Sequence, residues 1–523
     1  MSPPSGNGRR VTYPGHPGAP RPESGARVPE TAVIGAGIAG LTAATALAER
    51  GVSVTLFERE SYLGGRVGAW PARLRDGTQV TMSRGFHAFF RQYYNLRALL
   101  RRTDPGLERL VALEDYPLRD ARGLIDTFAG LPKAPPLNAL AFALRSPTFS
   151  VRDLLRLRAA KALPLAAVSV PDIYHELDHV DAASYLKSIN FPAAARHLAF
   201  EVFSRSFFAD PADLSAAELA TMFHLYFLGS SEGLVFDVPS APFPDALWNP
   251  LSAYLTARGT DIRIATAVAT VGRDRSGGYV IHPEDGRPLR ADAVVLALDT
   301  GGLRQLVERS PDLGDARWRD DVAALRVAPP FLVRRLWLDR PVSPARPAFL
   351  GTGGLSPLDN ISVLDRYERD AAEWAARTGG SVVELHAYAA KTGDPAWLSE
   401  RVAGLLREIY PETAAGVVGD IAVWRQDCPL FGLGGFARRP RVTTGDPNVV
   451  LAGDCVRVDL PVALMERAAT SGFLAANQLL RTWDLAGHAI SSVPNHGRLA
   501  PLRWLAAGHR RARRWRSAKR RSA

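Results

Sequence analysis

A glycine-rich turn between a short apolar strand and a helix constrains the fold of this chain more than any other feature. The turn is Gly35-Ala36-Gly37-Ile38-Ala39-Gly40, between an expected strand at 31–34 and an expected helix at 40–50. The first glycine permits the tight bend, the second lets a ligand approach the backbone, and the third lets the helix pack closely on the strand. The helix N-terminus then offers free amides and a positive dipole end to a pyrophosphate. The turn predicts a Rossmann-type α/β fold.

Glu58 completes this unit at the end of the next expected strand, 52–57. A carboxylate in this register accepts hydrogen bonds from ribose hydroxyls and disfavours the 2′-phosphate of NADP. A plain structural turn, the alternative, has no need of an acid here. We therefore expect a dinucleotide site that includes Glu58 and its neighbour Arg59.

Two further glycine stretches favour FAD over NAD. Gly64-Gly65-Arg66 allows close backbone approach, and the guanidinium of Arg66, like that of Arg84, can reach a pyrophosphate or a flavin. Gly453-Asp454 follows an expected strand at 449–452 and precedes an expected helix at 465–480. The aspartate can bind ribityl hydroxyls, while the first helical amides face the flavin, where negative charge grows on reduction. An ordinary βα unit is the alternative interpretation of this last stretch.

No second strand, glycine turn and helix occur together elsewhere in the sequence. Gly351–Gly354 and Gly432–Gly435 are rich in glycine but lack that context. We therefore expect no separate NADPH-binding domain, which leaves oxygen or a quinone as the electron acceptor.

These stretches resemble the flavin amine oxidase and phytoene desaturase superfamily over about residues 31 to 485. The resemblance implies FAD, with the first glycine turn and Glu58 on its ADP part and Gly453-Asp454 on its ribityl chain. Residues 245–255 and 294–297 are similar to the middle FAD segments of that superfamily. The expected cofactor-binding residues are Gly35, Ala36, Gly37, Ile38, Ala39, Gly40, Glu58, Arg59, Gly64, Gly65, Arg66, Arg84, Val268, Ala297, Gly453, Asp454, Met465 and Ala468.

Three stretches rich in aromatic residues point to one family within this superfamily. Residues 84–96, 204–210 and 222–227 are similar to the isorenieratene synthase family of carotenoid enzymes. Members of that family desaturate the β-ring of a carotenoid and shift one methyl group, which gives an aromatic end group. The resemblance implies an apolar carotenoid such as β-carotene as the substrate.

The same resemblance makes the 84–96 stretch the expected catalytic region. His87 is the candidate base, and Phe86 and Phe89 are candidates to stabilise a ring cation through their faces. Packing in the core is the open alternative for each aromatic residue of the stretch, and a structural hydrogen bond is the alternative for His87.

Two other classes of function stay open. One is a different FAD-dependent oxidase or desaturase of the superfamily, acting on a linear carotene, an amine or a porphyrinogen. The other is a non-catalytic protein that binds a flavin or a pigment. An amine oxidase should place a lysine near the flavin, but none of the five lysines lies in a flavin motif. This counts against the amine alternative.

The net charge of +11 is concentrated at the ends of the chain. Residues 501–523 hold nine Arg and Lys and no acid, whereas residues 31–500 are electrically balanced. A balanced body argues against a nucleic-acid groove. The tail is either solvated and disordered or in contact with anionic lipid. Residues 154–170 are a second segment that could contact the membrane interface, and the alternative is that they pack as a helix in the fold.

The apolar stretches, the N-terminus and the cysteines predict a cytoplasmic protein. A peripheral contact with the inner face of the membrane stays open. No apolar stretch approaches the roughly 20 residues that cross a bilayer, and the N-terminus has no hydrophobic signal. The two cysteines form no C-x-x-C pair, so we expect neither a disulfide framework nor a metal site.

The chain is expected to alternate between two domains. We assign 30–110, 245–305 and 421–490 to the FAD-binding domain, and 111–244 and 306–420 to a mixed helical and β-sheet substrate domain. Residues 1–29 are rich in Pro, Gly and Ser and are expected to be disordered, and 501–523 form the basic tail.

Overall fold

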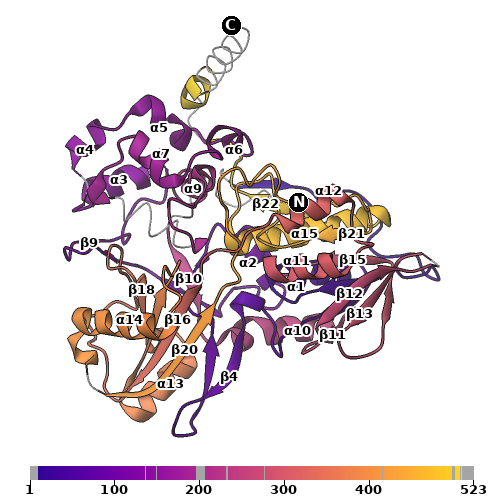
Figure 1. The fold of residues 1–523 in the computed structure, drawn as a ribbon, viewed down its shortest axis with the longest axis horizontal. Coiled ribbons are helices and arrows are strands. Elements are labelled where there is room, and N and C mark those ends of the chain that lie inside the picture. The colour runs from indigo at the N-terminus through magenta and orange to yellow at the C-terminus, as the bar shows by residue number, and fades with distance from the viewer. Residues whose placement is uncertain are drawn as a thin grey trace.

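Short apolar runs form a five-stranded parallel sheet, because such runs can be buried on both faces. The computed structural model describes residues 10–135, 137–148, 150–195, 207–230, 232, 234–275, 277–414, 416–497, 501–506 and 508. The strand order is β11-β3-β2-β15-β21, and the strands come from distant parts of the chain (Figure 1). Their bounds are β2 Glu30–Ile34, β3 Ser53–Phe57, β11 Asp261–Arg263, β15 Ala293–Leu296 and β21 Val449–Leu451. The expected strands at 31–34, 52–57 and 449–452 are confirmed.

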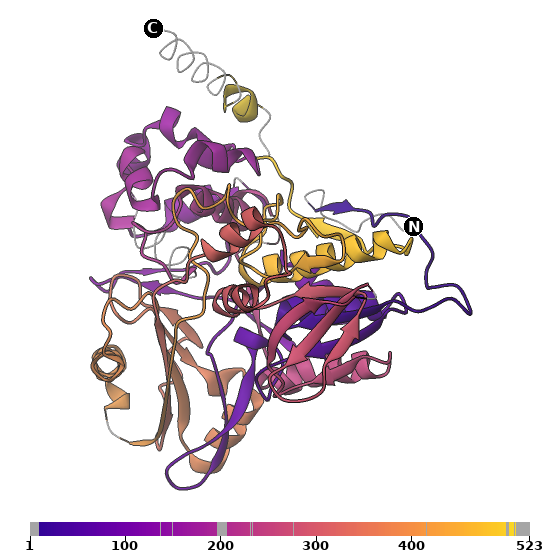
Figure 2. The same cartoon turned by 45° about the vertical axis from the view of Figure 1, so that its right-hand side comes forward.

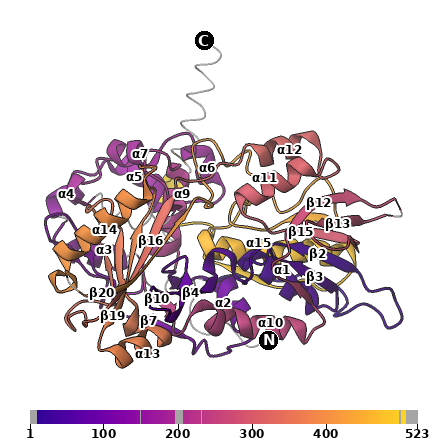
Figure 3. The ribbon, with the colours of Figure 1, turned by 60° about the horizontal axis from the view of Figure 1, so that its bottom comes forward.

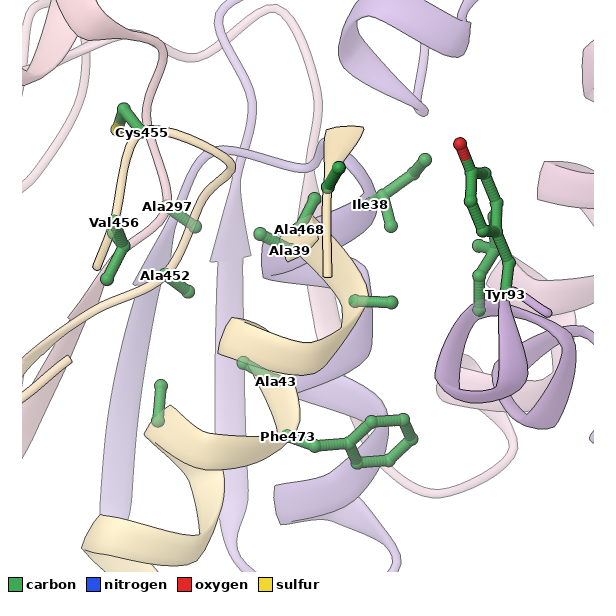
Figure 4. Close-up of a cluster of buried hydrophobic side chains, with 14 of the residues drawn as sticks. Ile38, Ala39, Ala43, Tyr93, Ala297, Ala452, Cys455, Val456, Ala468 and Phe473 are labelled. Atoms are coloured by element: carbon green, nitrogen blue, oxygen red, sulfur yellow. The ribbon is translucent and has the colours of Figure 1, made fainter. Parts of the chain in front are cut away.

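Two helices pack together against this sheet. They are α1, Ile38–Ala48, and α15, Leu464–Thr482, and every residue of α1 is buried. A Cβ added at Gly472 of α15 would lie 2.4 Å from the carbonyl oxygen of Ala39, so glycine is needed where the helices meet. Figure 4 shows Ala39, Ala43 and Ala468 within this buried region. Small residues therefore set the close approach of α15 to the glycine turn.

Further elements surround the five-stranded sheet. A three-stranded sheet, β12-β13-β14, lies beside it together with α10 and α11 (Figure 1). The bounds are α2 Tyr94–Leu100, α10 Asn249–Thr256, β12 Val268–Arg273, β13 Tyr279–Pro283, β14 Leu289–Ala291, α11 Thr300–Arg309 and α12 Ala316–Ala323. A hairpin, β4 Ala69–Arg73 with β5 Gln79–Ser83, leads from the glycine pair at 64–65 toward the second half of the molecule.

The second half is built on a seven-stranded sheet in the order β20-β16-β19-β18-β17-β8-β9. The helices α13 and α14 lie beside it (Figures 1 and 3). The bounds are β8 Leu118–Arg119, β9 Ile125–Asp126, β16 Phe331–Leu338, β17 Phe349–Gly351, β18 Asn360–Val363, α13 Arg369–Thr378, β19 Ser381–Ala387, α14 Pro395–Ile409 and β20 Val417–Arg425. Strand β20 crosses the expected domain boundary at residue 421.

A group of helices lies over one end of the seven-stranded sheet (Figures 1 and 2). They are α3 Leu137–Arg145, α4 Val151–Leu155, α5 Ala159–Ala166, α6 Asp172–Leu177, α7 Ala182–Ser188 and α9 Ala216–Phe223. A three-stranded sheet joins this region to the rest, and its strands are β6 Phe89–Phe90, β7 Leu110–Leu113 and β10 Phe236–Pro239. No helix in the described ranges is both long and apolar enough to span a bilayer.

The expectation of disorder throughout residues 1–29 is wrong from residue 10 onward. Strand β1, Val11–Tyr13, pairs with β22, Ile490–Ser492. The following chain also packs tightly, since a Cβ added at Gly15 would lie 2.2 Å from the carbonyl oxygen of Gly487. A partner distant in sequence therefore orders a segment whose composition predicts disorder. Residues 1–9 and most of the basic tail lie outside the described residues.

Candidate active site

One cavity of about 570 Å³ extends from the glycine turn to the seven-stranded sheet. It brings together almost all the residues predicted from the sequence. Those that line it are Gly35, Gly37, Ile38, Ala39, Glu58, Arg59, Gly64, Gly65, Arg66, Arg84, Phe86, His87, Val268, Ala297, Gly453, Asp454, Met465 and Ala468. Ala36, Gly40 and Phe89 are not part of the lining.

The three glycines of the turn have different physical roles. Gly35 has φ +102°, and a Cβ there would lie 2.4 Å from the carbonyl oxygen of Ala297. A Cβ at Gly40 would lie 1.8 Å from the carbonyl oxygen of Gly35. At Gly37, in contrast, the nearest atom to an added Cβ is 3.9 Å away. The protein itself leaves that space open, so Gly37 leaves room for a bound group, as a pyrophosphate on a helix N-terminus requires.

Glu58 is held at the end of β3 by two backbone amides. It accepts hydrogen bonds from the nitrogens of Ala36 (2.8 Å) and Glu60 (2.9 Å). Burial raises the pKa of Glu58, and these hydrogen bonds oppose that rise. Its carboxylate lines the cavity beside Arg59, which pairs with Asp299 at 3.0 Å. The carboxylate is thus fixed where the sequence places a ribose.

Arginine–aspartate pairs join segments that are distant in the sequence. Arg66 Nη2 lies 2.6 Å from Asp454 Oδ1, and Arg84 forms an ion pair with Asp427. Asp427 was left without a role by the sequence, and it also lines the cavity. Gly453 is positioned by Ser471, whose Oγ accepts a hydrogen bond from its amide at 2.9 Å. These contacts fix the C-terminal Gly-Asp against the Gly-Gly-Arg segment.

Glu466 and Arg467, adjacent near the start of α15, bind different parts of the structure. Glu466 accepts hydrogen bonds from the backbone nitrogens of Asn95 (2.9 Å) and Leu96 (3.0 Å), in the first turn of α2. Arg467 instead donates to Glu218 at 2.8 Å. Adjacent residues on a helix face different directions, so each side chain binds a different element.

His87 faces the cavity with one ring nitrogen already engaged. Its Nδ1 lies 2.8 Å from the carbonyl oxygen of Gly85, which can only accept, so Nδ1 carries the proton. Burial lowers the pKa of His87 to about 4, and the ring is therefore neutral at pH 7. The Nε2 atom is left as a proton acceptor. This geometry suits the predicted base.

Phe86 and Phe89 differ in position. Phe86 lines the cavity and packs on Phe349 (4.5 Å between ring centroids) and Phe236 (5.5 Å). Phe89 is fully buried in the core, with 0% exposure, and does not line the cavity. Successive side chains of a strand point to opposite faces, so in β6 it is Phe90 that faces the cavity. The candidacy of Phe89 as a catalytic residue is therefore corrected.

The wall opposite the glycine turn comes from residues that no sequence motif marks. Phe331, Phe349, Asn360 and Tyr388 all line the cavity from or next to strands of the seven-stranded sheet. Only the sheet pairing brings these residues together, and their spacing along the chain carries no signal.

Comparison with known proteins gives consistent relationships. The family model described as flavin containing amine oxidoreductase matches residues 38–480. A carotenoid phi-ring synthase from Streptomyces griseus is 59% identical over 92% of this chain and 93% of its own length. A carotenoid phi-ring synthase from Chlorobaculum tepidum is 27% identical over 89% of this chain and 90% of its own. Among solved structures, a cyclohexylamine oxidase from Brevibacterium oxydans has a TM-score of 0.63 at 16% identity, covering 88% of this chain and all of its own.

Proposed function

The chain belongs to the flavin containing amine oxidoreductase family, and we propose that this FAD-dependent oxidoreductase aromatises the terminal β-ring of a carotenoid. The observation that carries the proposal is the 59% identity, over almost the whole of both chains, with a carotenoid phi-ring synthase. The cavity supports it, because aromatic residues line its wall opposite the glycine turn. An apolar ring needs such a wall, which also excludes water.

The residues that line the cavity fit FAD. The open space at Gly37 accepts a pyrophosphate at the N-terminus of α1. Glu58 and Asp454 also line the cavity, and we assign the first to a ribose and the second to the ribityl chain. Bound FAD supplies the acceptor for a hydride from the substrate.

The residues of the aromatic wall would hold the ring and stabilise its positive charge. Removal of a hydride leaves a ring cation, which a 1,2-methyl shift can rearrange before a proton is lost. Phe86 presents its ring to the cavity, where an aromatic face attracts a cation. His87 can accept a proton at Nε2, because Nδ1 donates to Gly85. Two rounds of hydride and proton loss give the aromatic ring.

The first prediction is a change of pigment in cells that accumulate β-carotene. Expression of the chain should give new pigments with the same carbon count and four fewer hydrogens per reacted ring, as measured by mass and absorption. The methyl shift is read from the substitution pattern of the ring by NMR. Unchanged β-carotene beside FAD-loaded protein would contradict ring aromatisation. A desaturated linear carotene in cells that make no β-carotene would support the alternative substrate, in line with a 28% identical zeta-carotene desaturase from Synechocystis.

We further propose that the helices over the end of the seven-stranded sheet contact a membrane surface, from which a carotenoid would be taken. Helix α3 exposes Leu137, Leu140 and Leu144, with 56%, 52% and 60% of each residue accessible. Leu155 at the end of α4 is 81% exposed, and Trp504 near the start of the basic tail is 80% exposed. Apolar residues beside basic ones suit the headgroup region.

The second prediction tests this surface by co-sedimentation with anionic liposomes. Leu140→Glu combined with Leu144→Glu should weaken lipid binding by at least about tenfold, because full burial of even one leucine contributes roughly 1.5–3 kcal/mol and tenfold corresponds to about 1.4 kcal/mol. Val417→Glu with Val418→Glu is the matched control, since both valines are 49% exposed on β20. An equal loss of liposome binding in both double variants would contradict a specific contact between α3 and the membrane. FAD absorbance should be unchanged in each.

A further inference from the structure

Three polar side chains form a buried row at the end of the cavity that adjoins the seven-stranded sheet. Glu384 and His386 lie on β19, and Tyr388 follows its last residue. They alternate along the chain, so they share one face of the strand. Glu384 and His386 are 0% and 1% exposed, whereas Tyr388 lines the cavity. The row thus connects the core of the sheet with the cavity.

The inner end of the row is a fixed negative charge. Arg335 on β16 donates to Glu384 Oε2 from Nε at 3.0 Å and from Nη2 at 2.6 Å. Burial alone would raise the pKa of Glu384, but the charge of Arg335 and the hydrogen bonds from His386 and Arg335 outweigh it and lower that pKa to about 2. Glu384 is therefore a carboxylate and can only accept hydrogen bonds.

The charge on Glu384 sets which atoms donate and which accept in the hydrogen bonds along the row. His386 Nε2 lies 2.8 Å from Glu384 Oε1, so Nε2 carries the ring proton and donates it to the carboxylate. The amide nitrogen of Phe86 also lies 3.2 Å from Nε2, but a protonated Nε2 has no lone pair to accept from it. In the neutral ring Nδ1 is then the acceptor, and it receives the hydroxyl proton of Tyr388. Asn360 Nδ2 in turn donates to the Tyr388 oxygen at 3.2 Å.

We propose that Tyr388, backed by His386 and Glu384, is a proton acceptor for the carotenoid ring. The inference rests on the proposed function. In the step, a C–H bond of the ring cation breaks and its electron pair becomes a C=C bond. The released proton goes to the Tyr388 oxygen while the hydroxyl proton of Tyr388 moves to His386 Nδ1. The ring is oxidised, and FAD reduced, in the preceding hydride transfer, so the proton step needs no further oxidant.

The surroundings of the row favour this role over a purely structural one. A buried carboxylate and imidazole are costly to desolvate, and here their hydrogen bonds lead to the cavity. Gly85, with φ +90°, packs directly on the His386 ring, since a Cβ there would lie 2.5 Å from Cε1. The loop that carries Phe86 and His87 is thereby held against the row. Other titratable or charged groups that face it are Arg335, His87, Asp359 and Cys428.

The test is Tyr388→Phe in the FAD-loaded protein, which keeps the ring and removes the hydroxyl. The rate at which the desaturated ring forms from β-carotene, followed by quenching single turnovers without oxygen, gives the kinetic measurement, because proton loss follows the hydride transfer that reduces the flavin. We expect this rate to fall about 100- to 1000-fold, a range typical of general acid–base catalysis. The dissociation constant for β-carotene should stay within about twofold, because the packing surface is retained. Tyr410→Phe, in the cluster between the sheet and α14, is the matched control and should form the desaturated ring at the wild-type rate.

A second measurement does not depend on turnover. With ¹⁵N-labelled histidine, the Nδ1 resonance of His386 should show a hydrogen-bonded acceptor in the wild type and shift in Tyr388→Phe, while the Nε2–H bonded to Glu384 persists. A wild-type Nδ1 that carries the proton would overturn the assigned direction of the row. Wild-type rates of ring desaturation in Tyr388→Phe would overturn the catalytic role alone. If β-carotene fails to reduce the flavin of the wild-type protein, this result would instead overturn the proposed function on which that role rests.

Discussion

Gly37→Val is expected to give a folded protein that purifies without FAD. Gly37 has φ −72° and ψ −178°, a conformation open to any residue, so valine adds no backbone strain. The nearest protein atom to a new Cβ is 3.9 Å away, at Gly65 Cα, so the side chain does not clash with the fold. It occupies the space in front of the first amides of α1, where the pyrophosphate is expected. We predict that the dissociation constant for FAD rises by at least about 1000-fold, or roughly 4 kcal/mol.

Two other glycines supply the controls for this prediction. Gly404→Val in α14 places the same side chain where no atom lies within 4 Å and outside the cavity lining, so FAD binding should be unchanged. Gly40→Ala should instead prevent folding, because its Cβ would lie 1.8 Å from the carbonyl oxygen of Gly35. Flavin absorbance and circular dichroism separate the three cases. A yellow, folded Gly37→Val protein would show that this turn does not bind the cofactor.

The second large effect is expected at Glu218, a fully buried carboxylate on α9. Its Oε2 accepts from Arg467 Nη2 at 2.8 Å, and its Oε1 forms an ion pair with Arg439 at 2.6 Å. Glu218→Gln leaves two buried guanidinium groups without their anion. Removal of one partner of a buried ion pair costs about 3–5 kcal/mol, so the free energy of unfolding should fall by that amount. Chemical unfolding in guanidinium measures it.

The pH dependence of the same ion pairs has a definite sign. Burial raises the pKa of Glu218, but Arg467 and Arg439 outweigh burial and hold it below its ordinary value of about 4.5. A carboxyl whose pKa is lowered on folding contributes stability above its unfolded pKa, and that contribution is lost as the pH falls through its folded pKa. The wild type should therefore lose more stability than Glu218→Gln when the pH falls below about 4.5.

A surface pair is the control for both measurements. Arg401 and Glu408 lie 3.4 Å apart on α14, with side chains 43% and 64% exposed. Because exposed pairs contribute about 0–1 kcal/mol, Glu408→Gln should change stability only slightly. If Glu218→Gln were no more destabilising than Glu408→Gln, the buried pairs would not stabilise the fold.

Residues close together in the sequence determined the cofactor half of this protein. A tight turn, a helix N-terminus and the acid after the next strand act through neighbouring backbone atoms, so their spacing alone predicts their geometry. The structure places Gly37 and Glu58 on one cavity, as their spacing predicts. The strand and helix of the second glycine stretch were predictable for the same reason, since β21 is a short apolar strand and α15 is a long amphipathic helix.

Only the tertiary structure decided which distant residues complete the site. The pair of Arg66 with Asp454, 388 positions apart, follows from the packing of α15 near the glycine turn. The face of β6 decided that Phe90, and not Phe89, reaches the cavity. Sheet pairing between β16, β18 and β19 assembled the row that ends in Tyr388. A strand pattern shows which residues share a face, but the partner strands and their register are set by burial across the whole sheet.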